Sequence, residues 1–132
     1  MITVKMFLLS ILLHFVADYT LQGCLSNLKQ RKWWVDYFNN QIFSLRVVHS
    51  RKYRHDYICG LVCHALYWTL VTFAPLLWIA KGVTALALIV LGNTLFHAVV
   101  DHMKCNCYKI NLWQDQVLHL AQIVVTYVIF FK

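Results

Sequence analysis

Four long apolar runs constrain the fold of this chain more than any other feature of its sequence. They cover residues 2–22, 58–80, 83–103 and 112–131, and each is close to the ~20 residues that a helix needs to span a bilayer. The chain is 61% hydrophobic and 13% charged, whereas a soluble domain carries about 25% charged residues. We therefore predict one all-α domain over residues 1–132, built as a bundle of four transmembrane helices.

The connection between the first two runs, residues 23–57, is long and basic. Trp34, Phe38, Ile42 and Leu45 recur in it at helical spacing, which predicts an amphipathic helix in the membrane interface, with a partly ordered loop as the alternative. The positive charges of this connection fit positive-inside topology and attraction to anionic lipid. Binding of phosphate, in a substrate or in nucleic acid, is a further role that can coexist with these. These cations are Lys29, Arg31, Lys32, Arg46, Arg51, Lys52 and Arg54.

The distribution of lysine and arginine predicts which side faces the cytoplasm. Nine of these residues lie in the connections after the first and third runs, against only Lys5, Lys81 and Lys132 on the opposite side. Positive residues favour the cytoplasmic side, so both basic connections are expected there, with both termini opposite. The odd number of cysteines, five, indicates free thiols on a reducing side, and the C-x-C of Cys105 and Cys107 is a weak metal signal.

Each apolar run also carries a polar stripe at helical spacing. In the first run Ser10, His14, Asp18 and Gln22 are each four residues apart. Residues three or four apart share one helix face, and polar faces in lipid turn toward the interior of a bundle. The stripes of the other runs are Gly60, His64, Trp68 and Thr72; Asn93, His97 and Asp101; and Asp115, His119, Gln122 and Thr126.

The ionisable members of these stripes are predicted to meet at one depth. They stand near the ends of the first and third runs and near the starts of the second and fourth. Antiparallel threading brings them to the same half of the bilayer, roughly 5–15 Å from the cytoplasmic surface at 1.5 Å rise per residue. The converging residues are His14, Asp18, His64, His97, Asp101, Asp115 and His119.

A pocket of four imidazoles and three carboxylates is suited to a divalent transition metal such as zinc or manganese. The set offers more ligands than one tetrahedral ion takes, so two ions are the expected content. Paired ions activate water and stabilise an in-line displacement at phosphorus. The candidates for orienting the ligands through hydrogen bonds are Gln22, Tyr67, Asn93 and Gln122.

The same residues also fit three roles without metal-dependent catalysis. Interhelical hydrogen bonding accounts for any single pair. Haem ligation accounts for His64 and His119 but leaves three aspartates unexplained. A proton or ion pathway favours polar stripes through both leaflets, whereas the far half of each run is nearly all apolar.

Four motifs carry a resemblance to a known family. They are HFVADYTLQ (14–22), HALYW (64–68), HAVVDH (97–102) and INLWQDQVLHLAQI (110–123). Over nearly its whole length the chain resembles a family of small bacterial and phage membrane proteins catalogued as a domain of unknown function. That family is distantly similar to membrane-bound metal-dependent hydrolases. It is also similar to zinc-dependent phospholipase C and its single-strand nuclease relatives, which are all-helical enzymes that cleave phosphoesters.

The resemblance implies that the seven converging residues, from His14 to His119, are metal ligands. In the soluble enzymes H-x-x-x-D pairs hold a zinc cluster, whereas the pair in the fourth run here is reversed, with Asp115 before His119. This chain is also much shorter than those enzymes. The resemblance therefore favours a two-metal site over a three-metal site.

These observations lead to the expectation of a membrane-embedded, metal-dependent hydrolase that acts on a phosphoester at the cytoplasmic face. Its substrate would be a lipid headgroup or a nucleotide, and Asp101 or Asp115 would be the catalytic general base. The alternative is a small, non-enzymatic phage-type membrane protein whose His/Asp cluster is structural or binds metal or haem without hydrolysis. The sequence leaves the oligomeric state open, a homo-oligomer included.

Overall fold

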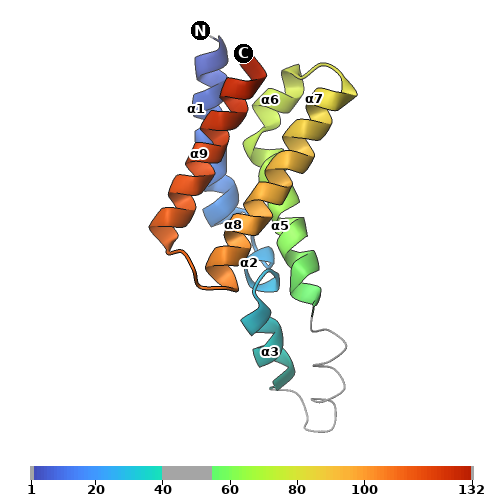
Figure 1. Ribbon diagram of the computed structural model, residues 1–132, viewed down its shortest axis with the longest axis vertical. Coiled ribbons are helices and arrows are strands. Elements are labelled where there is room, and N and C mark those ends of the chain that lie inside the picture. Colours follow the sequence, from blue (N-terminus) through green and yellow to red (C-terminus); the bar gives the residue numbers. More distant parts are fainter. Residues whose placement is uncertain (1, 40–54, 132) are drawn as a thin grey trace.

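The computed structural model describes residues 2–39 and 55–131, and every regular element in these two ranges is helical. The long helices run roughly along one axis, with α2 and α3 at the end opposite both termini (Figure 1). The elements in chain order are α1 (Ile2–Phe15), η1 (Val16–Thr20), α2 (Leu25–Leu28), α3 (Arg31–Asn39), α5 (Asp56–Thr72), α6 (Ala74–Ile79), α7 (Val83–Ala87), η2 (Leu88–Gly92), α8 (Asn93–Cys105) and α9 (Leu112–Phe131).

Three stretches of the described chain are long and apolar enough to cross a membrane: Thr3–Thr20, Val83–Cys105 and Leu112–Phe131. The predicted span over 58–80 differs, because it is divided at Phe73 into α5, of 17 residues, and α6, of 6 residues. Proline has no N–H to donate and its ring crowds the preceding turn, so Pro75 starts a new helix rather than continuing the old one. The all-α prediction is thus confirmed, while the second of the four predicted spans is not one continuous helix.

The basic connection packs against the end of the bundle through α2. Gly60 of α5 lies so close to α2 that an added Cβ would overlap the carbonyl oxygen of Leu28. Asn106, just after α8, donates from Nδ2 to the carbonyl of Lys29 at 3.1 Å and accepts from the backbone N–H of Arg31 at 2.7 Å. These contacts fix the segment that carries Lys29.

Only part of the predicted interfacial helix can be compared with the structure. Its beginning, including Trp34, is helical as α3. Ile42 and Leu45 lie outside the described residues, and so do the predicted cations Arg46, Arg51, Lys52 and Arg54.

The interior of the bundle divides into an apolar half and a polar half. Toward the termini, buried Phe73, Leu76, Ile123 and Tyr127 form an apolar core. The outer surface carries many exposed large apolar side chains, such as Leu91, which is 68% exposed. A polar interior with an apolar exterior is the arrangement expected of a helix bundle in lipid.

The close approach at Gly60 generates a stability prediction. Gly60→Ala should lower the thermal stability of the detergent-solubilised protein by about 1–3 kcal/mol, because the new methyl group forces α2 away from α5. Gly92→Ala is the matched control, since a Cβ at that helical glycine meets no atom within 4 Å. Equal melting temperatures for the two variants would contradict the packing described here.

Candidate metal centre

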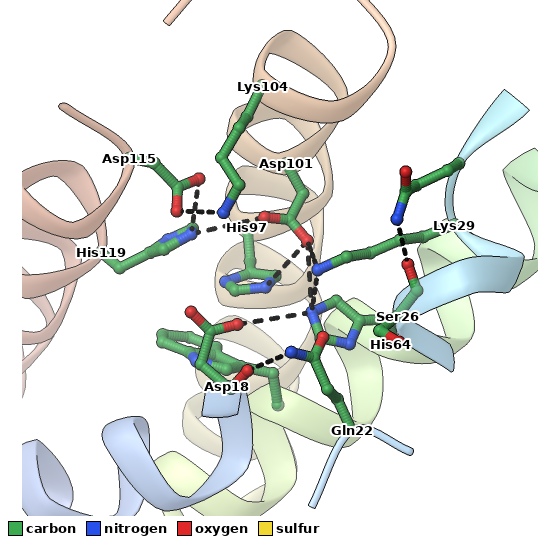
Figure 2. A network of polar contacts seen from close by, with 12 residues as sticks. Asp18, Gln22, Ser26, Lys29, His64, His97, Asp101, Lys104, Asp115 and His119 are labelled. Carbon is green, nitrogen blue, oxygen red and sulfur yellow. Dashed lines mark hydrogen bonds and ion pairs between the residues drawn. The ribbon is translucent and has the colours of Figure 1, made fainter. Parts of the chain in front are cut away.

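Asp101 of α8 lies at the middle of a buried cluster of ionisable side chains (Figure 2). Its Oδ2 is 3.2 Å from Nε2 of His64 and 3.7 Å from Nε2 of His97, one helical turn earlier. Its Oδ1 is 3.6 Å from Nε2 of His119. The side chains of Asp101 and these three histidines are completely buried. Side chains from α5, α8 and α9 therefore meet at a single carboxylate.

Gln116 of α9 ties the remaining residues to this cluster. Its Nε2 donates to Oδ2 of Asp18 at 2.9 Å and to Oδ2 of Asp115 at 3.1 Å, and its Oε1 accepts from Nε2 of His14 at 3.1 Å. The indole N–H of Trp68, which can only donate, bonds Nδ1 of His14 at 3.0 Å. Both nitrogens of His14 are therefore engaged by protein groups. His14 lies beside the cluster as a positioned histidine with no lone pair left for a metal.

Aromatic stacking fixes the orientation of the central imidazoles. The ring of His97 stacks on that of His119, with centroids 4.1 Å apart and planes at 23°. It also stacks on Trp68 at 4.1 Å and 21°. Since Trp68 is fully buried, these rings have little freedom to turn.

Two lysines reach into the same cluster. Lys29, only 4% exposed, donates from Nζ to Oδ2 of Asp101 at 2.7 Å and to Nε2 of His64 at 3.0 Å. Lys104 Nζ lies 2.5 Å from Oδ2 of Asp115, and its side chain is 23% exposed. The sequence groups Lys29 with the cations of a membrane-facing surface, whereas the structure buries its ammonium group between a carboxylate and an imidazole.

The other predicted residues lie around the cluster rather than in it. Gln22 donates to the backbone carbonyl of Asp18, and Tyr67 packs against the apolar core. Gln122 donates to Oδ1 of Asn93 at 2.9 Å, one turn away from the histidines. The side chains of Arg31 and Lys32 are exposed on α3.

The unpaired atoms of the cluster fit a divalent ion. Both ring nitrogens of His97, Nε2 of His119, and Oδ1 of Asp101 and of Asp115 are buried without a hydrogen-bond partner among the described residues. His119 Nε2 lies 3.4 Å from Asp115 Oδ1 and 3.6 Å from Asp101 Oδ1, which is too long for a hydrogen bond. Zinc bonds of 2.0–2.1 Å in tetrahedral geometry place ligand atoms about 3.3–3.5 Å apart. His97, Asp101 and His119 thus form a three-residue candidate site, with Asp115 beside His119 at its edge.

A second group of residues, Asp18, His64 and His97, also places its ligand atoms within 4.8 Å of one another. It shares His97 with the group of His97, Asp101 and His119. A neutral imidazole has only one lone pair for a metal, so His97 cannot serve two ions at once. The His64 nitrogen that lies 3.8 Å from Oδ1 of Asp18, Nε2, accepts from Lys29. None of the five cysteines, all of which are described, belongs to either group.

The fold and the cluster together define a class: an all-helical protein with three apolar helices of membrane-spanning length and a buried His/Asp group that can hold a metal ion. No protein-family model, no curated protein sequence and no solved structure matches this chain. The resemblance carried by the four sequence motifs therefore stays a prediction.

The roles of three side chains in the cluster were not predicted from the sequence. Lys104 stands three residues after Asp101, and Gln116 stands three residues before His119, so helical spacing alone could have placed both on the faces of the cluster. Lys29 had no such signal, because it directly follows the four-residue helix α2, which is too short to show periodicity.

The candidate ligand set predicts how metal content responds to substitution. His97→Asn and His119→Asn should remove the ion from the purified protein, since each change deletes one of the three grouped ligands. His102→Asn is the control, because His102 stacks on Tyr57 outside both groups. Elemental analysis gives the metal-to-protein ratio. An unchanged ratio in both cluster variants would exclude this ligand set.

Lys29→Met should affect the metal-free and the metal-loaded protein in opposite directions. Without metal, removing the ammonium leaves the buried carboxylate of Asp101 without its ion pair, at a cost of about 3–5 kcal/mol in unfolding free energy. With metal, the same change frees Asp101 and His64, so the ion should bind more tightly. Thermal unfolding with and without added metal measures both effects, and Lys32→Met, at an exposed position, is the control. A loss of stability that metal does not reverse would contradict this competition.

Proposed function

We propose that the protein is a membrane-embedded, metal-dependent hydrolase of phosphoesters. The observation that carries the proposal is the pairing of Lys29 with Asp101 and of Lys104 with Asp115 inside a cluster that fits a divalent ion. Cleavage of a phosphoester develops negative charge on phosphoryl oxygens, and fixed cations in a buried site stabilise that charge. The resemblance of the sequence motifs to membrane-bound metal-dependent hydrolases agrees with this assignment.

The residues have separable roles in this proposal. His97, His119 and the free oxygen of Asp101 would hold one divalent ion, which would supply polarisation of water and of the phosphoryl group. One ion is favoured over the two expected from the sequence. The three buried carboxylates already face two ammonium groups, so a single divalent ion leaves only one net positive charge.

Asp115 is the stronger candidate for the general base. Its partner Lys104 is the member of the cluster that reaches solvent, so water approaches the site from that side. When the carboxylate accepts a proton from water, Lys104 is released to pair with a phosphoryl oxygen. Asp101, which is held by Lys29 and surrounded by three histidines, acts mainly as a ligand.

The proposal includes an orientation in the bacterial inner membrane. The paired helices α5 and α6 would make a fourth crossing beside the three long apolar stretches. The basic connections would face the cytoplasm, with both termini on the other side. Both termini do lie at the end of the bundle opposite α2 and α3 (Figure 1). The metal centre would then sit in the cytoplasmic half of the bilayer.

A second candidate function is a non-enzymatic membrane protein stabilised by the same cluster. It is favoured by the burial of the cluster, in which Asp18 at 5% is the most exposed of the seven predicted residues. Each aspartate of the cluster also already has a lysine or glutamine partner. In this role the polar network would join the helices and would need no substrate.

Assays on phosphoesters separate the two functions. The metal-loaded protein should release phosphate or alcohol from a phosphoester panel, and Asp115→Asn should lower kcat by about 10²–10⁴-fold through loss of the general base. Removal of the metal with a chelator should abolish turnover, and added metal should restore it. Asp36→Asn, on the exposed side of α3, is the control. Metal-loaded protein that turns over no phosphoester would favour the structural role.

A further inference from the structure

A groove of about 630 Å³ lies between α7, η2 and α8 on one side and α9 on the other. This is within the range of about 300–1,000 Å³ that small-molecule pockets occupy. Its walls are mainly apolar, with Leu88, Phe96, Val125 and Ile129 among them. Leu88 is 69% exposed and Ile129 is 70% exposed, so the groove opens on the outer surface of the bundle.

One end of the groove adjoins the metal centre. Asn93 and Gln122 line that end, and they stand one helical turn from His97 and His119 respectively. Gln122 donates to Asn93, and Thr126 donates to Oδ1 of Asn93 at 2.9 Å, so this polar network joins α8 to α9 at the inner end. The groove therefore lies on the same faces of α8 and α9 as the metal centre. One helical turn, about 6 Å along the helix axis, separates Asn93 from His97.

The length of the groove matches one lipid chain. From Ala85 to Phe96 the lining extends over eleven residue-to-residue steps, about 16 Å at 1.5 Å rise per residue. This is about half of the ~30 Å hydrocarbon core, which is the depth that one leaflet occupies. Both walls belong to stretches of membrane-spanning length, so lipid chains are the molecules that would surround the groove.

We propose that this groove is the acyl-chain subsite of the metal centre, so that the substrate is a membrane lipid phosphoester rather than a soluble nucleotide. This inference rests on the proposed hydrolase function. A chain lying in the groove would put its phosphate at the level of Asp101 and the two lysines. The burial of the centre also favours a lipid substrate over a soluble nucleotide. The histidines, the aspartates and Lys29 of the centre are at most 5% exposed, whereas Lys104 is 23% exposed.

Gly92 offers a direct way to fill the groove. It lines the groove, a Cβ there meets no atom within 4 Å, and its backbone is helical at φ −61° and ψ −47°. Gly92→Phe should therefore occupy the chain site without straining the backbone. Leu91→Trp is the matched control, because Leu91 is exposed at the neighbouring position and does not line the groove.

Photo-crosslinking tests the binding step independently of catalysis. Protein in vesicles of phosphatidylethanolamine and phosphatidylglycerol would receive phosphatidylglycerol with a diazirine in its acyl chain. Crosslinks should concentrate on groove residues such as Phe96 and Val125, fall at least several-fold in Gly92→Phe, and persist in Leu91→Trp. Crosslinks spread evenly over the apolar surface, and equal in all three proteins, would overturn the subsite even if the protein hydrolyses phosphoesters.

Kinetics then test the link to the centre. With a long-chain lipid phosphoester, Gly92→Phe should raise KM at least tenfold, while kcat/KM for a water-soluble short-chain analogue should stay unchanged. Equal losses on both substrates, or none on either, would refute the acyl-chain subsite and leave the hydrolase standing. If the wild-type protein cleaves neither substrate but is crosslinked in the groove, the hydrolase fails and the groove remains a lipid site unconnected with catalysis.

Discussion

The burial of three carboxylates inside an apolar bundle is the constraint on which the rest of this structure depends. An unpaired ionised carboxylate in such surroundings is too costly to keep, so each must meet a cation, a metal or several donors. Asp18, Asp101 and Asp115 meet this need with groups from distant parts of the described chain, including Lys29 from the connection and Gln116 from α9. The same demand joins η1, α5, α8 and α9 at the cluster.

The cations and donors around these carboxylates do not pair every carboxylate oxygen, and the unpaired oxygens are available to a metal ion. Lysines and Gln116 bind one oxygen of each aspartate, while the second oxygens of Asp101 and Asp115 face His119 without a hydrogen bond. Trp68 stacks on His97 from the apolar half and at the same time bonds His14. The rings of the centre are thus held from the side of the apolar core. The two ammonium groups reach the centre from the opposite side: Lys29 directly follows α2, and Lys104 lies near the end of α8. Fixed ligands and fixed cations in a buried site are what the proposed hydrolysis would require.

Much of this arrangement could be predicted from spacing alone. Steps of four between His14 and Asp18, or between His97 and Asp101, place each pair on one face, and antiparallel threading places the pairs at one depth. The break at Phe73 was harder, because a proline near the end of an apolar run can either kink a spanning helix or end it. Whether a histidine binds metal or only supports the site also depends on tertiary contacts. Nothing in the sequence distinguishes His14, whose ring nitrogens are both hydrogen-bonded, from His97, whose ring nitrogens have no hydrogen-bond partner in the described part of the chain.

X-ray absorption spectroscopy on the metal that copurifies with the protein tests the central claim most directly, because it reports the ligand atoms themselves. We expect only nitrogen and oxygen neighbours at about 2.0–2.2 Å, with the outer-shell scattering typical of two imidazoles. Sulfur neighbours at about 2.3 Å would instead assign the ion to the cysteines. That spectrum, or one without imidazole scattering, would contradict a centre built from His97, Asp101 and His119.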